Sequence, residues 1–220
     1  MTGDIIDSTR LSQAGLEGVR RLLQQAAEAF CNSYGGTVEA RLDFYRGDAW
    51  QLLLTEQRLA LRLSLYLRAR LRAELEADTR VAVGLGTVEA IDRDRLSRST
   101  GEAFTLSGRA LDAMTGYFDM TAALPPRAGV LGDWLPAVFH LCSDMVRGWT
   151  RRQAEISAVA LLMPDATHEQ IAGTLRPKVT KQTVTASLSG ANWRALQEAL
   201  TTFETTQWTK LLTGDSVADS

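Results

Sequence analysis

Two acidic residues stand beside predicted strands near the start of the chain. Asp4 lies in the apolar segment 2–6, and Asp48 lies in the turn Arg46-Gly47-Asp48. Carboxylates on neighbouring strands repel each other unless a cation lies between them, and Mg²⁺ prefers a few protein oxygens together with substrate phosphates. If Asp4 and Asp48 converge, they are suited to hold Mg²⁺ (or Mn²⁺) against a nucleotide triphosphate.

The elements that must position this pair follow from the spacing of apolar residues. Period-two or dense apolar runs predict strands, and apolar spacings of three and four predict helices. The first half of the chain then has the order β-α-β-β-α-β-α-β, at residues 2–6, 11–31, 37–44, 49–54, 55–77, 80–91, 101–114 and 117–122. We expect an α+β fold with a ferredoxin-like split βαβ layer, in which the first strand is antiparallel to the third and Asp4 lies beside Asp48.

The segment after the first strand is a candidate phosphate-binding turn. Asp7, Ser8, Thr9 and Arg10 lie where a helix is expected to begin, and free N–H groups at a helix start bind anions. Ser8 and Thr9 have a structural alternative as helix caps, and so does Asp7. Turns favour aspartate, so turn or cap roles are also the competing interpretation for the two metal-binding candidates.

The long second helix, residues 55–77, combines leucines at helical spacing with arginines between them. We interpret Arg58, Arg62, Arg68 and Arg72 as its solvated face. The whole chain has 220 residues and a formal net charge of −2, enough for one sizeable core or two small ones and without a field directed at nucleic acid or membrane. No signal-peptide pattern and no apolar run of about 18 residues occurs, so we expect a cytoplasmic protein without a membrane segment.

The second half of the sequence is expected to be helical. Pro125-Pro126 marks a boundary between a palm domain, residues 1–124, and a helical domain, residues 127–212. The polar tail, residues 213–220, is expected to be disordered. Capping-box sequences open helices after Thr150 and Thr167, and a single last helix is expected over residues 192–211. The expected core of this half includes Trp134, Trp149, Trp193 and Trp208.

Residues 167–188 have the pattern of a helix-turn-helix, with a turn at 176–179 that is longer than in compact DNA-binding versions. Between residues 147 and 194, seven basic residues outnumber three acidic ones. Basic and small polar residues on the second helix suit contacts with phosphates and base edges, whereas the alternative is a helical unit used for dimerisation or packing. The DNA-binding candidates are Arg151, Arg152, Lys178, Thr180, Lys181, Gln182, Thr183 and Thr185.

Four segments in order resemble motifs of the class III nucleotidyl cyclases. Asp4-Ile5-Ile6-Asp7-Ser8-Thr9 and Arg46-Gly47-Asp48 resemble the two metal motifs of that family. Residues 80–86 are similar to the strand that follows, and residues 101–109 resemble its Gly-x-x-Val-Asn-x-Ala-x-Arg element. The nearer resemblance is to the SatD-like branch, small bacterial proteins that open with Gly-Asp-Ile-x-Asp-Ser and often carry a C-terminal helix-turn-helix.

The resemblance implies a set of roles for individual residues. Asp4 and Asp48 would bind the metal ions with help from the carbonyl of Ile5, and Gly47 would lie against the nucleotide. Arg109 would stabilise phosphate charge in the transition state. In this family that arginine acts across a dimer interface, so the resemblance also implies a homodimer in which Arg109 serves the second copy's site.

The sequence departs from the family where catalysis and base selection are determined. Thr105 takes the place of the transition-state asparagine, Phe44 that of a base-reading lysine, and Arg98 that of a base-reading aspartate. Asp7 replaces a glycine of the phosphate turn. These departures favour metal–nucleotide binding over a purine cyclase of the usual specificity.

Three functions therefore compete. The first is a regulatory protein whose palm binds a metal–nucleotide triphosphate and whose helical domain binds DNA or a partner. The second is an active nucleotidyl cyclase or transferase that makes a nucleotide signal, with Arg109 and Thr105 in catalytic roles. The third is a transcription or scaffold protein with a degenerate palm.

Overall fold

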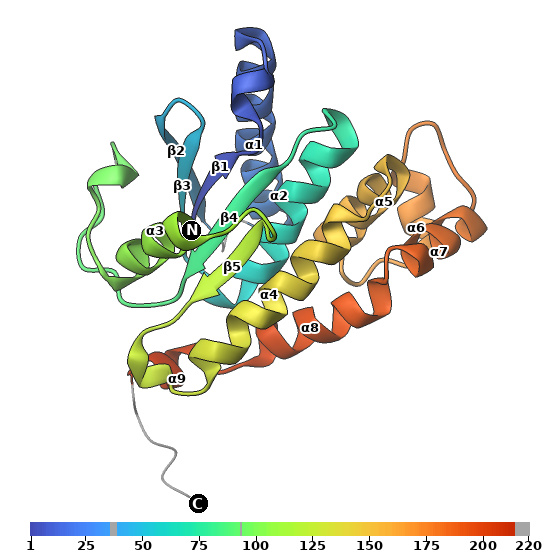
Figure 1. The fold of residues 1–220 in the computed structure, drawn as a ribbon. Coiled ribbons are helices and arrows are strands. Elements are labelled where there is room, and N and C mark those ends of the chain that lie inside the picture. Colours follow the sequence, from blue (N-terminus) through green and yellow to red (C-terminus); the bar gives the residue numbers. More distant parts are fainter. Residues whose placement is uncertain (36–38, 93, 214–220) are drawn as a thin grey trace, which may run out of the picture.

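The computed structural model describes residues 1–35, 39–92 and 94–213 (Figure 1). Residues 214–220 of the tail predicted at 213–220 and the predicted strand start at 37–38 lie outside the described residues, whereas Thr213 ends the last helix. The strands are β1 (Thr2–Ile5), β2 (Ala40–Arg46), β3 (Ala49–Leu54), β4 (Thr79–Gly84) and β5 (Met120–Ala123). The helices are α1 (Gln13–Ser33), α2 (Ala60–Glu74), α3 (Glu102–Ala113), α4 (Leu131–Arg147), α5 (Arg151–Leu162), α6 (His168–Thr174), α7 (Lys181–Gly190), α8 (Trp193–Thr205) and α9 (Trp208–Thr213).

The five strands form one sheet in the order β2-β3-β1-β4-β5. β1 is antiparallel to both β3 and β4, whereas β4 and β5 are parallel. The α+β class, the predicted order of elements and the antiparallel pairing of the first and third strands are thus confirmed. The strand predicted at 80–91 is shorter than expected and ends at Gly84.

The two faces of the sheet carry different helices. α1 and α2 cover one face, and α3 packs on the other against β4 and β1 (Figure 1). Gly84 permits this approach, because a Cβ added there would lie 2.1 Å from the carbonyl oxygen of Ala103. Ser107 of α3 shares a buried hydrogen bond of 2.8 Å with Thr2 of β1. α3 therefore rests directly on the strand that carries Asp4.

A buried tryptophan crosses β1 on the opposite face. The indole of Trp50 lies over Gly3, where an added Cβ would be 2.3 Å from both the ring and the carbonyl oxygen of Arg80. Across this gap, the indole N–H of Trp50 donates to the hydroxyl of Thr79 over 2.9 Å. Because Gly3 has no side chain, Trp50 of β3 can cross β1 and bond Thr79 of β4. This contact joins the three strands next to Asp4.

The interpretation of the second helix's arginines as a solvated face is wrong for two of them, and Arg72 is also bonded within the protein, with a side chain only 23% exposed. The side chains of Arg62 and Arg68 are only 8% and 0% exposed, because α2 contacts α1, α4 and α5 as well as the sheet. Arg62 pairs with Glu204 of α8, with 2.5 Å between Nε and Oε1. Arg58 is half exposed and pairs with Glu56, so it matches the expectation.

The helical second half packs directly onto the first. α4 lies along β5, α5 lies along α2, and buried residues of both halves form a common core. Pro125-Pro126 is therefore not a break in packing, although the chain does turn helical after it. Among the residues that the structure describes, no helix has the length and hydropathy needed to cross a bilayer.

Details of the helical half differ from expectation at two points. The helix predicted at 192–211 is divided into α8 and α9. Trp134 is 66% exposed instead of buried, whereas Trp149, Trp193 and Trp208 lie in the core as predicted. The capping boxes at Thr150 and Thr167 are both present.

The contact between Gly3 and Trp50 gives a stability prediction. Gly3→Ala should lower the free energy of unfolding by about 3 kcal/mol, because the methyl group must displace either a ring or a backbone carbonyl. The matched control is Gly18→Ala in α1, where an added methyl meets no described atom within 4 Å and should stabilise the helix by about 0.5–1 kcal/mol. Urea unfolding of the two variants measures both effects, and equal stabilities would contradict this packing.

Candidate functional site

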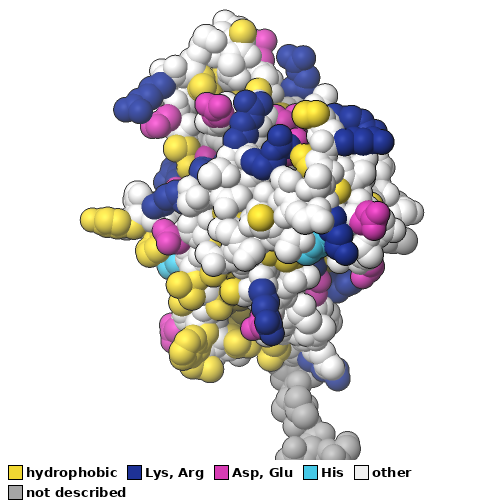
Figure 2. Space-filling view, turned by 90° about the vertical axis from the view of Figure 1, so that its right-hand side faces the viewer, with side chains coloured by type: hydrophobic (Ala, Val, Ile, Leu, Met, Phe, Trp, Pro, Cys, Tyr) yellow, Lys and Arg dark blue, Asp and Glu magenta, His cyan; other side chains and the backbone are white. Residues whose placement is uncertain are grey.

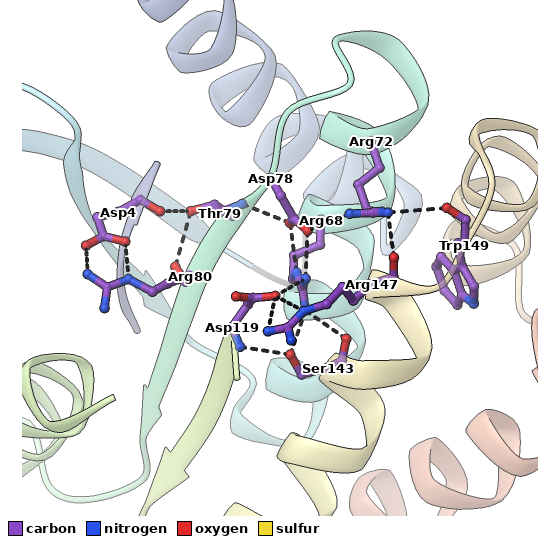
Figure 3. Close-up of polar contacts among 10 residues, drawn as sticks. All are labelled: Asp4, Arg68, Arg72, Asp78, Thr79, Arg80, Asp119, Ser143, Arg147 and Trp149. Atoms are coloured by element: carbon purple, nitrogen blue, oxygen red, sulfur yellow. Dashed lines mark hydrogen bonds and ion pairs between the residues drawn. The ribbon is translucent and has the colours of Figure 1, made fainter. Parts of the chain in front are cut away.

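Asp4 is paired with an arginine from the neighbouring strand. Asp4 and Arg80 lie directly opposite each other in the β1–β4 ladder, so their side chains share one face of the sheet. Nε of Arg80 donates to Oδ1 of Asp4 over 2.8 Å, and Nη2 donates to Oδ2 (Figure 3). These hydrogen bonds raise the pKa of Arg80 above its ordinary value, and the charge of Asp48 adds to the effect. Asp4, the first metal-binding candidate, is thus already paired with the guanidinium of Arg80.

Asp48 is tied to the segment that follows β1. Its carbonyl oxygen accepts a hydrogen bond of 3.2 Å from the N–H of Ile5. Its carboxylate accepts one of 2.5 Å from the hydroxyl of Ser8. Because Asp4 pairs with Ala49, the residue after Asp48, the structure brings Asp4, Ile5, Ser8 and Asp48 to one corner of the sheet.

The turn after β1 differs from the predicted helix start. Residues Ser8–Arg10 form a single 3-10 turn, and α1 begins later, with the side chain of Ser12 accepting from the N–H of Gly15. The alternative roles of Ser8 and Thr9 as caps of α1 are therefore wrong. Asp7 adopts a left-handed conformation with φ 54°, a region that aspartate enters more readily than most residues. One short turn lacks the aligned peptide dipoles of a longer helix, so phosphate binding here loses that support.

Asp7 and Arg10 lie at the outer edge of the same corner. Their side chains form an exposed ion pair of 3.4 Å. Thr9 is exposed as well, and Gly47 makes the tight β2–β3 turn with φ 72°. These residues border the Asp4–Asp48 corner and remain accessible to a ligand.

Phe44 does not join the carboxylates. It lies opposite Trp50 in the β2–β3 ladder, on the face of the sheet that α1 and α2 cover. The guanidinium of Arg20 from α1 lies 5.0 Å from the centre of its ring. The β-strand alternation thus turns Phe44 away from Asp4.

The remaining sequence candidates of the first half are exposed. Arg98 ends a 3-10 turn in the connection between β4 and α3. Thr105 and Arg109 lie on α3, and the Thr105 hydroxyl donates to the carbonyl of Gly101 over 3.3 Å. Within the described part of the chain, no hydrogen bond or ion pair joins Arg109 to Asp4 or Asp48. The predicted catalytic residue Arg109 is thus not bonded to either carboxylate within one copy of the chain.

Two further polar residues, Gln51 and Asp43, have side chains on the same face of the sheet as Asp4. Gln51 lies opposite Thr2 on β1 and opposite Asp43 on β2. Its side-chain oxygen is buried and has no hydrogen-bond partner in the described residues. Sequence reasoning missed this pair, although period-two spacing along β2 and β3 is the signal that places them there.

The protein side chains near Asp4 offer few ligands for a metal ion. Within residues 1–35, 39–92 and 94–213, no group of three or more His, Cys, Asp or Glu side chains is arranged to bind a metal. Asp4 and Asp48 offer two carboxylates, and Mg²⁺ bound to one or two carboxylates takes its other ligands from phosphates and water. The residues present therefore fit a metal–triphosphate better than a metal ion alone.

A network of largely buried hydrogen bonds and ion pairs fixes the backbone at Asp4. The hydroxyl of Thr79 donates to the carbonyl of Asp4 over 2.5 Å, and the N–H of Thr79 donates to Asp78 over 2.9 Å (Figure 3). Asp78 accepts from Arg68 over 2.6 Å and from Arg72 over 3.0 Å. The backbone at Asp4 is thereby connected to α2.

The same network reaches the helical half. Arg68 donates to Asp119, immediately before β5, over 2.9 Å and to the hydroxyl of Ser143 in α4 over 3.0 Å. Arg72 donates to the carbonyls of Arg147 and Trp149 (Figure 3). Sequence spacing gives no signal for these contacts, because the partners of Arg68 come from three separate elements.

The DNA-binding candidates fall into three groups. Arg151 donates to the carbonyl of Ala73 over 2.8 Å, and Arg152 pairs with Glu155 at 2.7 Å, so both have intramolecular roles. Lys181 and Gln182 are exposed at the start of α7, and Lys178 is exposed in the connection before it. The three threonines have structural contacts: Thr180 caps α7 through Thr183, and Thr185 shares a hydrogen bond of 2.8 Å with His168.

Basic and apolar side chains occupy different parts of the molecule's side at the right of Figure 1. Figure 2 looks onto that side, where Lys and Arg side chains gather mainly in the upper half among acidic ones. Hydrophobic side chains gather at the lower left. The basic residues thus form a mixed surface instead of a uniformly positive one.

The buried network gives a second stability prediction. Arg68→Met should lower the free energy of unfolding by about 3 kcal/mol, because Asp78 and Asp119 lose their buried cation and keep only the partly exposed Arg72 and Arg147. Arg152→Ala removes an exposed ion pair and should change it by less than about 0.5 kcal/mol. Chemical denaturation compares the two variants. If Arg68→Met has the free energy of unfolding of the wild type, the network adds no stability.

The sequence matches no protein-family model, no curated protein and no solved structure. The residues around Asp4 and Asp48 and those at the start of α7 therefore carry the functional inference.

Proposed function

We propose that this protein binds a metal–nucleotide triphosphate at the corner formed by Asp4 and Asp48. One observation carries the proposal: the ends of β1 and β3 meet there, with the N–H of Ile5 bonded to the carbonyl of Asp48. Asp4 lies on β1, and Asp48 lies in the turn that leads into the neighbouring strand β3, next to Ala49, the partner of Asp4 in the ladder. Asp4 and Asp48 would hold Mg²⁺ or Mn²⁺, which when bound would neutralise the charge of the phosphates.

The strand order supports a cyclase-like, SatD-like palm. Strands β2-β3-β1-β4 have the order and directions of a ferredoxin-like split βαβ layer, and β5 extends it at the edge. In this arrangement the carbonyl of Ile5 follows Asp4 at the end of β1. Ser8, already bonded to Asp48, lies where its hydroxyl would orient that carboxylate toward the metal.

Binding is better supported than turnover. Thr105 and Arg109 are exposed on α3, so a catalytic role for them requires that a second copy present its α3 to this corner. A homodimer of that kind would make the protein a nucleotidyl cyclase or transferase. A single copy has the groups for binding, and we therefore assign it a regulatory, nucleotide-binding role.

Thermal unfolding with each nucleoside triphosphate and Mn²⁺ tests the binding proposal. A triphosphate at about 100 times its dissociation constant stabilises by about 2.7 kcal/mol, which should raise the melting temperature by roughly 5–10 °C. Asp48→Asn should abolish the shift, whereas Asp165→Asn in the α5–α6 connection should retain it. If no triphosphate shifts the wild-type protein, the proposal is wrong and the scaffold function is favoured.

The same incubations separate binding from turnover. New phosphodiester product that disappears in Asp48→Asn and in Arg109→Ala would establish the cyclase or transferase function. Binding with unchanged nucleotide supports the regulatory function.

DNA binding is a second candidate function for the helical half. It is supported by the exposure of Lys178, Lys181 and Gln182 around the first turn of α7, which is the second helix of the helix-turn-helix pattern. Arg151 and Arg152 contribute less to this proposal because both are bonded within the chain.

Gel-shift titrations at several salt concentrations test DNA binding. Lys181→Ala should weaken binding and lower the slope of log affinity against log salt by about 1, as expected for the loss of one phosphate contact. Lys210→Ala in α9 is the control and should leave the slope unchanged. Binding that ignores Lys181, or no binding at low salt, would leave α6 and α7 as a packing unit.

A further inference from the structure

Arg80 holds the carboxylate that the proposed function assigns to the metal ion. Both Asp4 oxygens accept from its guanidinium, and the two residues are a direct cross-strand pair. Building on the proposed function, we propose that Arg80 is an exchangeable counter-ion, which pairs with Asp4 in the free protein and transfers to the triphosphate when the metal binds Asp4.

The two cations compete for one carboxylate. A divalent ion on Asp4 would lie within a few ångströms of the guanidinium of Arg80, and like charges at that distance repel strongly. The arginine must therefore leave when the metal arrives. Exposure permits this, because the side chain of Arg80 is 33% exposed and that of Asp4 is 20% exposed.

Arg68 is an example of a fixed counter-ion in this fold, and it can be compared with Arg80. The side chain of Arg68 is 0% exposed and is held by Asp78, Asp119 and Ser143 together. Arg80 has one carboxylate partner, at the edge of a solvent-accessible corner. The difference in burial and in number of partners makes Arg80 the guanidinium that can be exchanged.

The triphosphate offers Arg80 an equivalent partner. A guanidinium binds phosphate oxygens in the same forked geometry in which it binds a carboxylate. Arg80 shares the sheet face of Asp4, so a phosphate bound by the metal would lie within reach of its flexible side chain. In the exchange Asp4 passes from arginine to metal and Arg80 passes from carboxylate to phosphate, so every charge stays paired.

The exchange couples the two ligands. A metal ion alone must displace Arg80 without giving it a new partner, and a triphosphate alone must take Arg80 from Asp4 and leave that carboxylate unpaired. Each ligand therefore binds weakly alone and tightly with the other, and thermodynamic linkage makes the effect equal in both directions.

Electron paramagnetic resonance of free Mn²⁺ measures this coupling without any reaction. Mn²⁺ is titrated into the protein alone and with an excess of a non-hydrolysable triphosphate. In Arg80→Gln, Mn²⁺ alone should bind about tenfold tighter, and the factor by which triphosphate improves Mn²⁺ binding should fall about tenfold. Arg80→Lys retains the charge, so it should keep the weak binding of Mn²⁺ alone while losing part of the coupling, because a lysine lacks the forked geometry.

The control and the contrary outcomes are distinct. Arg58→Gln removes an equally charged but unrelated exposed arginine and should behave as wild type. If wild type binds Mn²⁺–triphosphate through Asp48 but Arg80→Gln has unchanged affinity for Mn²⁺ alone, Arg80 is only a strand cross-link and the exchange is wrong. If wild type binds no Mn²⁺–triphosphate, the proposed function itself fails, and the exchange fails with it. Circular dichroism measures whether each variant is folded. If Arg80→Gln does not fold, the loss of coupling in Arg80→Lys tests the exchange instead.

Discussion

The guanidinium of Arg68 is a charge with no exposed surface, and the fold is arranged around the need to keep it paired. It contacts Asp78 before β4, Asp119 before β5 and Ser143 in α4. A buried cation that loses its carboxylates is strongly destabilising. The sheet, α2 and α4 must therefore keep their relative positions, and buried hydrophobic residues of both halves also form a common core.

This constraint extends to the candidate site through one threonine. Thr79, next to Asp78, bonds the carbonyl of Asp4 and accepts from the indole of Trp50, which lies over the bare backbone of Gly3. The backbone of β1 is thus fixed at the residue that carries the carboxylate. On the other side of the sheet the Asp4 and Arg80 side chains remain partly exposed. The fixed backbone of β1 and the partly exposed Asp4–Arg80 pair together suit the proposed ligand, a triphosphate that binds with a metal ion.

Local patterns in the sequence predicted the order of elements, because apolar periodicity and capping boxes act within a few residues. The position of Asp4 beside the start of β3 also followed from topology. Arg68 was misjudged because the leucine spacing of α2 shows one apolar face, whereas helices and sheet surround it. The Asp4–Arg80 pair requires the strand register, which the sequence does not specify. Phe44 and Trp134 show the same limit, since the composition of a segment does not determine which way a side chain faces.

The account depends on Asp4 and Asp48 sharing a metal ion, and a crystal structure with Mn²⁺ and a non-hydrolysable triphosphate tests this most directly. It should show an anomalous peak within about 2.2 Å of a carboxylate oxygen from each residue, with phosphate oxygens completing the coordination. The guanidinium of Arg80 should lie on a phosphate. A metal bound elsewhere, or an Arg80 still paired with Asp4 beside bound nucleotide, would contradict the account.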